Sequence, residues 1–94
     1  MVLEMKRALE DLKKGADGAY RKIYDATYEE VYCKSLLITQ EEKQALSLVE
    51  DFYAGVLKEI GEALKAEDQN HWFWQQYYKK IRREYQKLLS VQHK

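Results

Sequence analysis

One stripe of apolar and aromatic residues constrains the fold of this chain more than any other feature. The stripe repeats on the three-and-four spacing of an α-helix and consists of Tyr20, Ile23, Tyr24, Thr27, Tyr28, Val31, Tyr32 and Ser35. A β-strand is excluded, because a period of two would put these tyrosines on one face together with polar residues. We therefore predict a long helix, with the tyrosine rings at the edge of a core and their hydroxyls at its rim.

The segment before this stripe predicts a shorter helix over residues 2–14. Its inward positions are Met5, Ala8, Leu9 and Leu12. Gly15 suits the left-handed residue that closes a helix, and Asp17 is the expected N-cap of the next one.

A third helix is predicted to begin at Thr39. Thr39 and Glu42 have the spacing of a capping box, in which each side chain accepts from the backbone N–H of the other residue. The apolar stripe that follows is Ala45, Leu48, Val49, Phe52, Tyr53, Val56, Leu57, Ile60 and Leu64.

The last helix is predicted over residues 71–91, with Asp68 or Asn70 as its cap. We draw its inward stripe through Trp74, Tyr77, Tyr78, Ile81, Tyr85 and Leu88, which leaves Trp72 and Phe73 outside it. The chain is thus expected to be all-α, a compact bundle of three to four helices in a single domain of residues 1–94. The absence of proline favours such long helices.

Composition indicates a cytoplasmic protein without a membrane segment. No stretch approaches the roughly 20 apolar residues that a membrane span needs, and the N-terminus lacks the features of a secretory signal. The single cysteine, Cys33, cannot form an internal disulfide, and no neighbouring Cys or His pairs with it for zinc.

Charge is distributed unevenly along the chain, although the formal net charge is zero. Residues 38–70 carry three basic and eight acidic side chains, whereas residues 71–94 carry six basic side chains and only Glu84 as an acid. The difference in charge between these two segments is more informative about binding partners than the net charge of the whole chain.

Enzyme chemistry is not expected. His71 and His93 lie at the ends of the last predicted helix, and the sequence has no catalytic triad, Gly-rich phosphate loop or metal-ligand spacing. We therefore predict no catalytic residues, no metal and no cofactor.

The strongest functional candidate is the segment 71–87, where aromatic and basic residues alternate along one helix. No single face can bury Trp72, Phe73, Trp74, Tyr77 and Tyr78 together. Rings that stack on unpaired bases, next to Lys and Arg that contact phosphates, are what single-strand binding requires. The alternative is a two-sided core helix with a solvated basic stripe.

From about residue 9 to residue 60 the chain resembles region 2 of the sigma-70 superfamily, especially the extracytoplasmic-function type. The matching residues are Gly15, Ala19-Tyr20, Ile23-Tyr24, Tyr28, Val31-Tyr32 and the segment Ala45–Tyr53. At positions prominent in that family for polymerase binding, Ser47 and Glu50 replace an Asp and a Gln. No counterpart of the second helical domain, region 4, follows, so we expect a divergent relative, with a second sigma-like subunit as a further candidate partner.

The resemblance implies a transcription-initiation factor or regulator that binds core RNA polymerase, single-stranded promoter DNA or both. The polymerase-binding residues would be Leu48, Glu50 and Asp51. The DNA-binding residues would be Trp72, Trp74, Lys79, Lys80, Arg82 and Arg83. The alternative function is a helical protein–protein interaction module, or a small regulatory or immunity-type protein that does not bind DNA.

Overall fold

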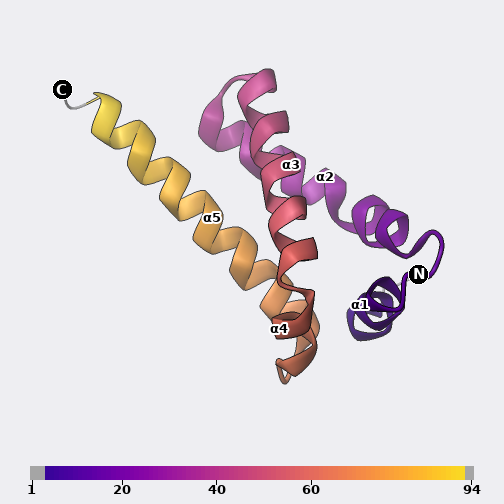
Figure 1. Cartoon of the computed structure of the whole chain (residues 1–94). Coiled ribbons are helices and arrows are strands. Elements are labelled where there is room, and N and C mark those ends of the chain that lie inside the picture. The colour runs from indigo at the N-terminus through magenta and orange to yellow at the C-terminus, as the bar shows by residue number, and fades with distance from the viewer. Residues whose placement is uncertain (1–3, 93–94) are drawn as a thin grey trace.

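The computed structural model describes residues 4–92, and within this range the chain forms five α-helices and no strand (Figure 1). The helices are α1 (Met5–Lys13), α2 (Ala19–Thr39), α3 (Glu42–Lys58), α4 (Ile60–Lys65) and α5 (Gln69–Gln92). The predicted all-α class is confirmed. The helix count exceeds the predicted three to four because the expected third helix breaks at Glu59, where the backbone leaves helical geometry between α3 and α4.

α2 and α3 form an antiparallel hairpin and share the most extensive helix–helix contact of the fold. Gln40 closes α2 in a left-handed conformation, and its N–H donates to the carbonyl of Leu36 at 2.8 Å. The predicted capping box is wrong. Thr39 still belongs to α2, so its hydroxyl donates to the Ser35 carbonyl at 2.9 Å, and α3 starts after Glu41 without a side-chain cap.

The turn between α1 and α2 is built on two glycines with positive φ. Gly15 has a φ of 77°, as predicted for the residue that follows α1. Asp17 is not the cap of α2, because Gly18 holds that position with a φ of 79° and leaves no side-chain cap.

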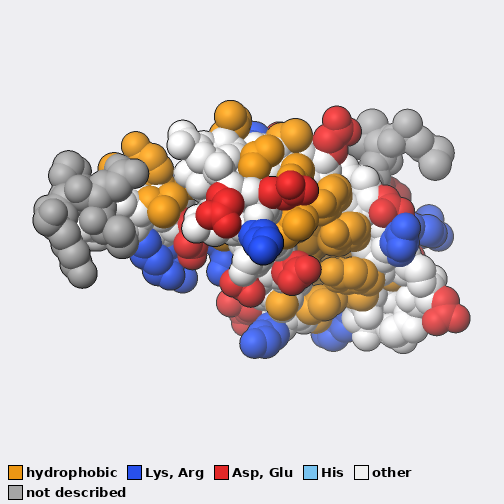
Figure 2. All heavy atoms as spheres, turned by 90° about the horizontal axis from the view of Figure 1, so that it is seen from above, with side chains coloured by type: hydrophobic (Ala, Val, Ile, Leu, Met, Phe, Trp, Pro, Cys, Tyr) orange, Lys and Arg blue, Asp and Glu red, His pale blue; other side chains and the backbone are white. Residues whose placement is uncertain are grey.

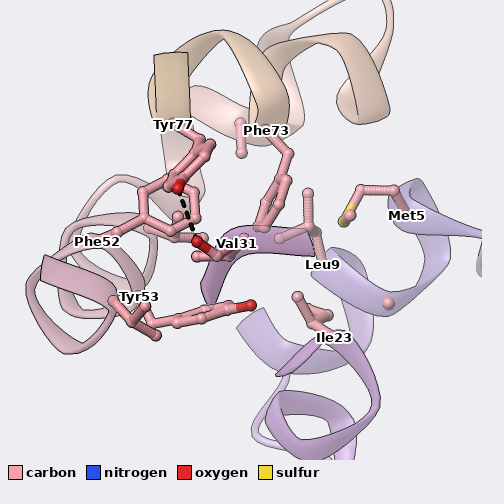
Figure 3. Packing of buried hydrophobic residues seen from close by; sticks show 12 residues of the cluster. Met5, Leu9, Ile23, Val31, Phe52, Tyr53, Phe73 and Tyr77 are labelled. Atoms are coloured by element: carbon pink, nitrogen blue, oxygen red, sulfur yellow. Dashed lines mark hydrogen bonds between the residues drawn. The ribbon is translucent and has the colours of Figure 1, made fainter. Parts of the chain in front are cut away.

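The core lies where α1, α2, α3 and α5 meet (Figure 3). Leu9, Val31 and Phe73 are fully buried at its centre. On α2 the buried line is Ile23, Thr27, Val31 and Ser35, while Tyr24, Tyr28 and Tyr32 are half-buried beside it and Tyr20 is 39% exposed. The predicted stripe is therefore two parallel rows, and the tyrosines form the outer one.

Two buried tyrosines fasten α3 and α5 to α2 through their hydroxyls. Tyr77 donates to the Val31 carbonyl at 2.7 Å and is also within 2.7 Å of the Ser35 hydroxyl. Tyr53 bonds to the hydroxyl of Thr27, which itself donates to the Ile23 carbonyl at 2.7 Å. The hydroxyls of Thr27 and Ser35 on α2 are thus satisfied inside the core.

The inward stripe predicted for α5 is rotated about the helix axis. Phe73, predicted outside the stripe, is fully buried with Tyr77, whereas Tyr78 and Tyr85 are 45% and 51% exposed. The inner row continues from Phe73 and Tyr77 to the half-buried Ile81, Glu84 and Leu88. Tyr78 and Tyr85 are each one residue, or about 100°, round the helix from that row. On α3, Leu57 is 41% exposed, because it lies about 100° round the helix from the buried Val56.

Candidate functional site

The residues predicted to bind DNA lie on different faces of α5. Successive residues of an α-helix are about 100° apart, so the side chains of Trp72 and Trp74 lie about 160° apart, on nearly opposite sides of α5. Lys79 and Arg83 follow Trp72 by seven and eleven residues, and both therefore return to the Trp72 side. We call the side of α5 that carries Trp72, Lys79 and Arg83 the basic face.

Trp72 is half-buried at the start of the basic face. Its indole lines a small hollow over α3, together with Phe52, Gly55, Val56, Glu59 and Gln76. A ring in this position is fixed by the core on one side and reaches the surface on the other. Asp68 sets the beginning of α5, because its carboxylate accepts from the His71 N–H at 3.0 Å, as predicted for the cap.

Trp74 is part of the joint between α5 and α2. Its ring packs edge-on against Phe73, with centroids 5.1 Å apart, and against Tyr77 at 6.0 Å. The ammonium of Lys34 on α2 lies 5.8 Å from the Trp74 ring and donates to the Tyr78 hydroxyl at 2.7 Å. The contacts of Trp74 therefore belong to a structural joint, and the structure does not bring it together with the basic face.

Lys34 stabilises this contact between α2 and α5 electrostatically. It lies 3.0 Å from the carboxylate of Glu30, one turn earlier on α2. The hydrogen bond to Tyr78, followed by the one to Glu30, raises the pKa of the Lys34 ammonium. The ammonium is therefore charged at neutral pH, as a cation over an aromatic ring requires.

The four basic residues that were predicted to bind DNA lie within one half of the circumference of α5. Lys79, Arg82 and Arg83 are exposed and Lys80 is half-buried. Lys80 and Arg82 each lie about 80° from the Trp72 direction, on opposite flanks of the basic face. Within the described part of α5, the acid Glu84 is paired with Lys87 at 3.4 Å.

The predicted polymerase-binding residues are also separated by the fold. Leu48 is a core residue with only 5% exposure, so its assignment to a partner surface is wrong. Glu50 and Asp51 are exposed. Glu50 lies towards α2, where burial and then this carboxylate raise the pKa of Tyr20. Asp51 lies towards α5, in a hollow shared with Glu84 and Leu88.

The sequence analysis did not identify an apolar surface that lies between the C-terminal end of α2 and the C-terminal part of α5. Leu37 is 77% exposed, and Tyr85 and Leu89 lie across from it in one hollow. The available signal was the run Leu36-Leu37-Ile38, since three consecutive residues of a helix cannot all face one core. The largest hydrophobic area in Figure 2 is a different one: it lies towards the middle of the molecule, away from the C-terminal end of α5, with acidic and basic side chains around it.

Other kinds of site find little support in residues 4–92. This range contains no cluster of three or more His, Cys, Asp or Glu side chains placed to hold a metal ion. None of the helices described is long and apolar enough to cross a membrane. No protein-family model, curated protein or solved structure matches the chain.

Proposed function

We propose that this domain binds single-stranded nucleic acid through the basic face of α5, as a transcription-initiation factor or regulator does with promoter DNA. The observation that carries the proposal is the common side of Trp72, Lys79 and Arg83 on one rigid helix. At a rise of about 1.5 Å per residue, Lys79 and Arg83 follow Trp72 along the helix by about 10 and 16 Å. If a nucleobase stacks on the Trp72 indole, the neighbouring phosphates of the strand are therefore within reach of Lys79 and Arg83.

The second half of the proposal is a protein partner, core RNA polymerase, on the outer face of α3. Glu50 and Asp51 supply the exposed acidic groups there, and Leu48 has no part in it. The resemblance to sigma region 2 over residues 9–60 supports this assignment. The opposite charges of residues 38–70 and 71–94 fit a domain that presents acids to a protein and bases to a nucleic acid.

Fluorescence anisotropy with a labelled single-stranded oligonucleotide tests the first half. We expect binding that weakens with salt, with a log–log slope of about −1.4 for the two phosphate contacts of Lys79 and Arg83. R83A should weaken binding and reduce the slope by about 0.7. The matched control is K43A, which removes the same charge from an exposed position of α3 and should leave binding unchanged. Absence of binding at low salt, or equal effects of the two variants, would refute the proposal.

A pull-down with core polymerase tests the second half. The variant with Glu50→Lys and Asp51→Lys should lose capture, because both charges of the acidic surface are reversed. Changing Glu29 and Glu67 to Lys reverses the same number of charges at exposed positions outside α3 and serves as the control. Capture that survives the α3 reversal would show that the surface is assigned to the wrong residues.

The second candidate is a helical protein–protein interaction module without nucleic-acid binding. The exposed apolar side chains at Leu37 and Tyr85 favour it, since large exposed apolar surfaces mark contacts with other molecules. In that case the oligonucleotide titration gives no signal, while changes at Leu37 alter association with the partner.

A further inference from the structure

Four tyrosines form a continuous row along the outer side of α2. We call it the tyrosine row, and it consists of Tyr20, Tyr24, Tyr28 and Tyr32. Consecutive rings have centroids 5.9, 5.0 and 5.7 Å apart, and their planes differ by at most 31°. Within residues 4–92, the other ring that packs against the row is that of Tyr53, which contacts Tyr20 and Tyr24. Tyr20 is 39% exposed and the other three are half-buried, so the row reaches the surface along its length.

A line of residues on α3 borders the tyrosine row. Glu42, Leu46 and Glu50 are spaced by four, so they share one side of α3, and all three are exposed. Burial and then the Glu42 carboxylate raise the pKa of Tyr32, as burial and then the Glu50 carboxylate raise that of Tyr20. The two carboxylates therefore lie at opposite ends of the row, with the apolar side chain of Leu46 between them.

The other charged groups next to the tyrosine row leave this surface acidic. On the α2 side they are Arg21, Asp25 and Glu29, each about 100° round the helix from the tyrosine before it. Arg21 and Asp25 form an ion pair at 3.1 Å, whereas Glu29 has no ion pair among the described residues. On α3, Lys43 lies about 60° beyond Leu46, on the side away from Tyr53. With Lys43 included, the surface has four acids and two bases.

We propose that the tyrosine row binds an extended, arginine-rich segment of another protein. The faces of aromatic rings carry partial negative charge, and the phenol and carboxylate oxygens accept hydrogen bonds, so the surface favours cations. The guanidinium group of arginine is planar, and it can stack on a ring while it donates two hydrogen bonds to a carboxylate. The excess of acids repels the phosphates of a nucleic acid.

The spacing of the tyrosine row fits an extended chain. Residues four apart in a helix recur about every 6 Å along its axis. In an extended segment, side chains on one face recur every two residues, or about every 6.6 Å. Arginines at alternate positions of the segment would therefore meet successive rings, and about seven residues would span the row.

The tyrosine row lies outside the proposed nucleic-acid site, which is on α5. It shares Glu50 with the proposed polymerase surface, whereas Asp51 lies about 100° further round α3 and does not border the row. A test at Glu42 and Tyr20 leaves both Glu50 and the basic face of α5 unchanged. Its outcome is therefore independent of the proposed function.

Fluorescence anisotropy of a labelled peptide of four Arg-Ser repeats, titrated with the full chain, tests the proposal. We expect saturable binding, and weaker binding when lysine replaces arginine in the peptide. Y20L removes the most exposed ring of the row and E42Q removes one carboxylate, so each should weaken binding about two- to fivefold. Y85L and E67Q make the same changes at exposed positions elsewhere and should leave binding unchanged. Circular dichroism checks that all four variants keep their helices.

Three results would overturn the proposal. Absence of peptide binding at low salt would mean that the row is not a binding surface for arginine. Equal affinity for the lysine peptide would mean that charge alone attracts the peptide. Equal effects of Y20L and Y85L would place the peptide on another part of the molecule. Oligonucleotide binding by Y20L and E42Q should be unchanged, which separates these outcomes from failure of the proposed nucleic-acid binding.

Discussion

Tyr53 and Tyr77 each place a phenol hydroxyl in the core, and each hydroxyl reaches a group on α2. Burial raises the pKa of Tyr53 from 10.0 to about 12, although its hydrogen bond to Thr27 acts in the opposite direction. Burial also raises the pKa of Tyr77. The folded state therefore keeps these protons at a pH at which the unfolded chain has lost them.

This difference predicts a loss of stability in alkaline solution. Below pH 10 both states are protonated and the full contribution of Tyr53 is present. Between pH 10 and about 12 only the unfolded chain ionises at this residue, so the free energy of unfolding falls, by roughly 2–3 kcal/mol in total. Urea denaturation at several pH values should show a shallower decline for Y53F. An identical decline in both proteins would contradict the pKa assigned to Tyr53.

At the scale of the element, α5 begins at a residue that the sequence identifies. Asp68 accepts from the His71 N–H, whereas Asn70, the other candidate cap, lies inside the helix. D68A should therefore lower the free energy of unfolding by about 1 kcal/mol, and N70A should have a much smaller effect. Thermal or urea denaturation of the two variants measures the difference. Equal losses would show that Asp68 is not the cap.

The helical periodicity predicted which segments form helices but not which side of each helix faces the core. On α2 and α5 the apolar residues cover a wide arc, and only the neighbouring helices decide which row is innermost. Phe73 is buried because α3 presents Phe52 to it, with ring centroids 5.1 Å apart. Such a partner cannot be read from the sequence of α5 alone. The exposure of Tyr78 and Tyr85, which lie beside the inner row of α5, has the same origin.

The sequence predicted which residues belong to the candidate site but not how they are arranged around α5. The basic residues of α5 and the two tryptophans were identified because aromatic and basic residues alternate over residues 71–87. The two-residue spacing of Trp72 and Trp74 already places them on opposite sides of a helix. Which side joins α2 depends on Lys34, forty residues earlier in the chain. Leu48 was misassigned because its neighbours Glu50 and Asp51 are exposed while it packs inward.

At the scale of the whole molecule, α1 completes the core although it is only nine residues long. It contacts α2, α4 and α5, and its Leu9 is fully buried among them. The molecule measures 46 × 23 × 21 Å, so its single core is narrow, and the end of α5 contributes little to it. A domain of this size has little stability to lose.

Removal of one central side chain should therefore have a large effect. L9A is expected to lower the free energy of unfolding by about 2–5 kcal/mol, through lost apolar burial and the cavity that remains. L37A, at a side chain that is 77% exposed, should change it by less than about 0.5 kcal/mol. Urea denaturation measures both. A small effect of L9A would mean that α1 is not part of the cooperative core.

The central claim is that the Trp72 side of α5 binds nucleic acid and the Trp74 side packs against α2. Tryptophan fluorescence tests it directly, because the chain has two tryptophans and each can be observed alone. In W74F, titration with a single-stranded oligonucleotide at low salt should quench the emission of Trp72 by stacking. In W72F, the emission of Trp74 should stay constant under the same conditions. Quenching in W72F together with constant emission in W74F would contradict the assignment of the two faces.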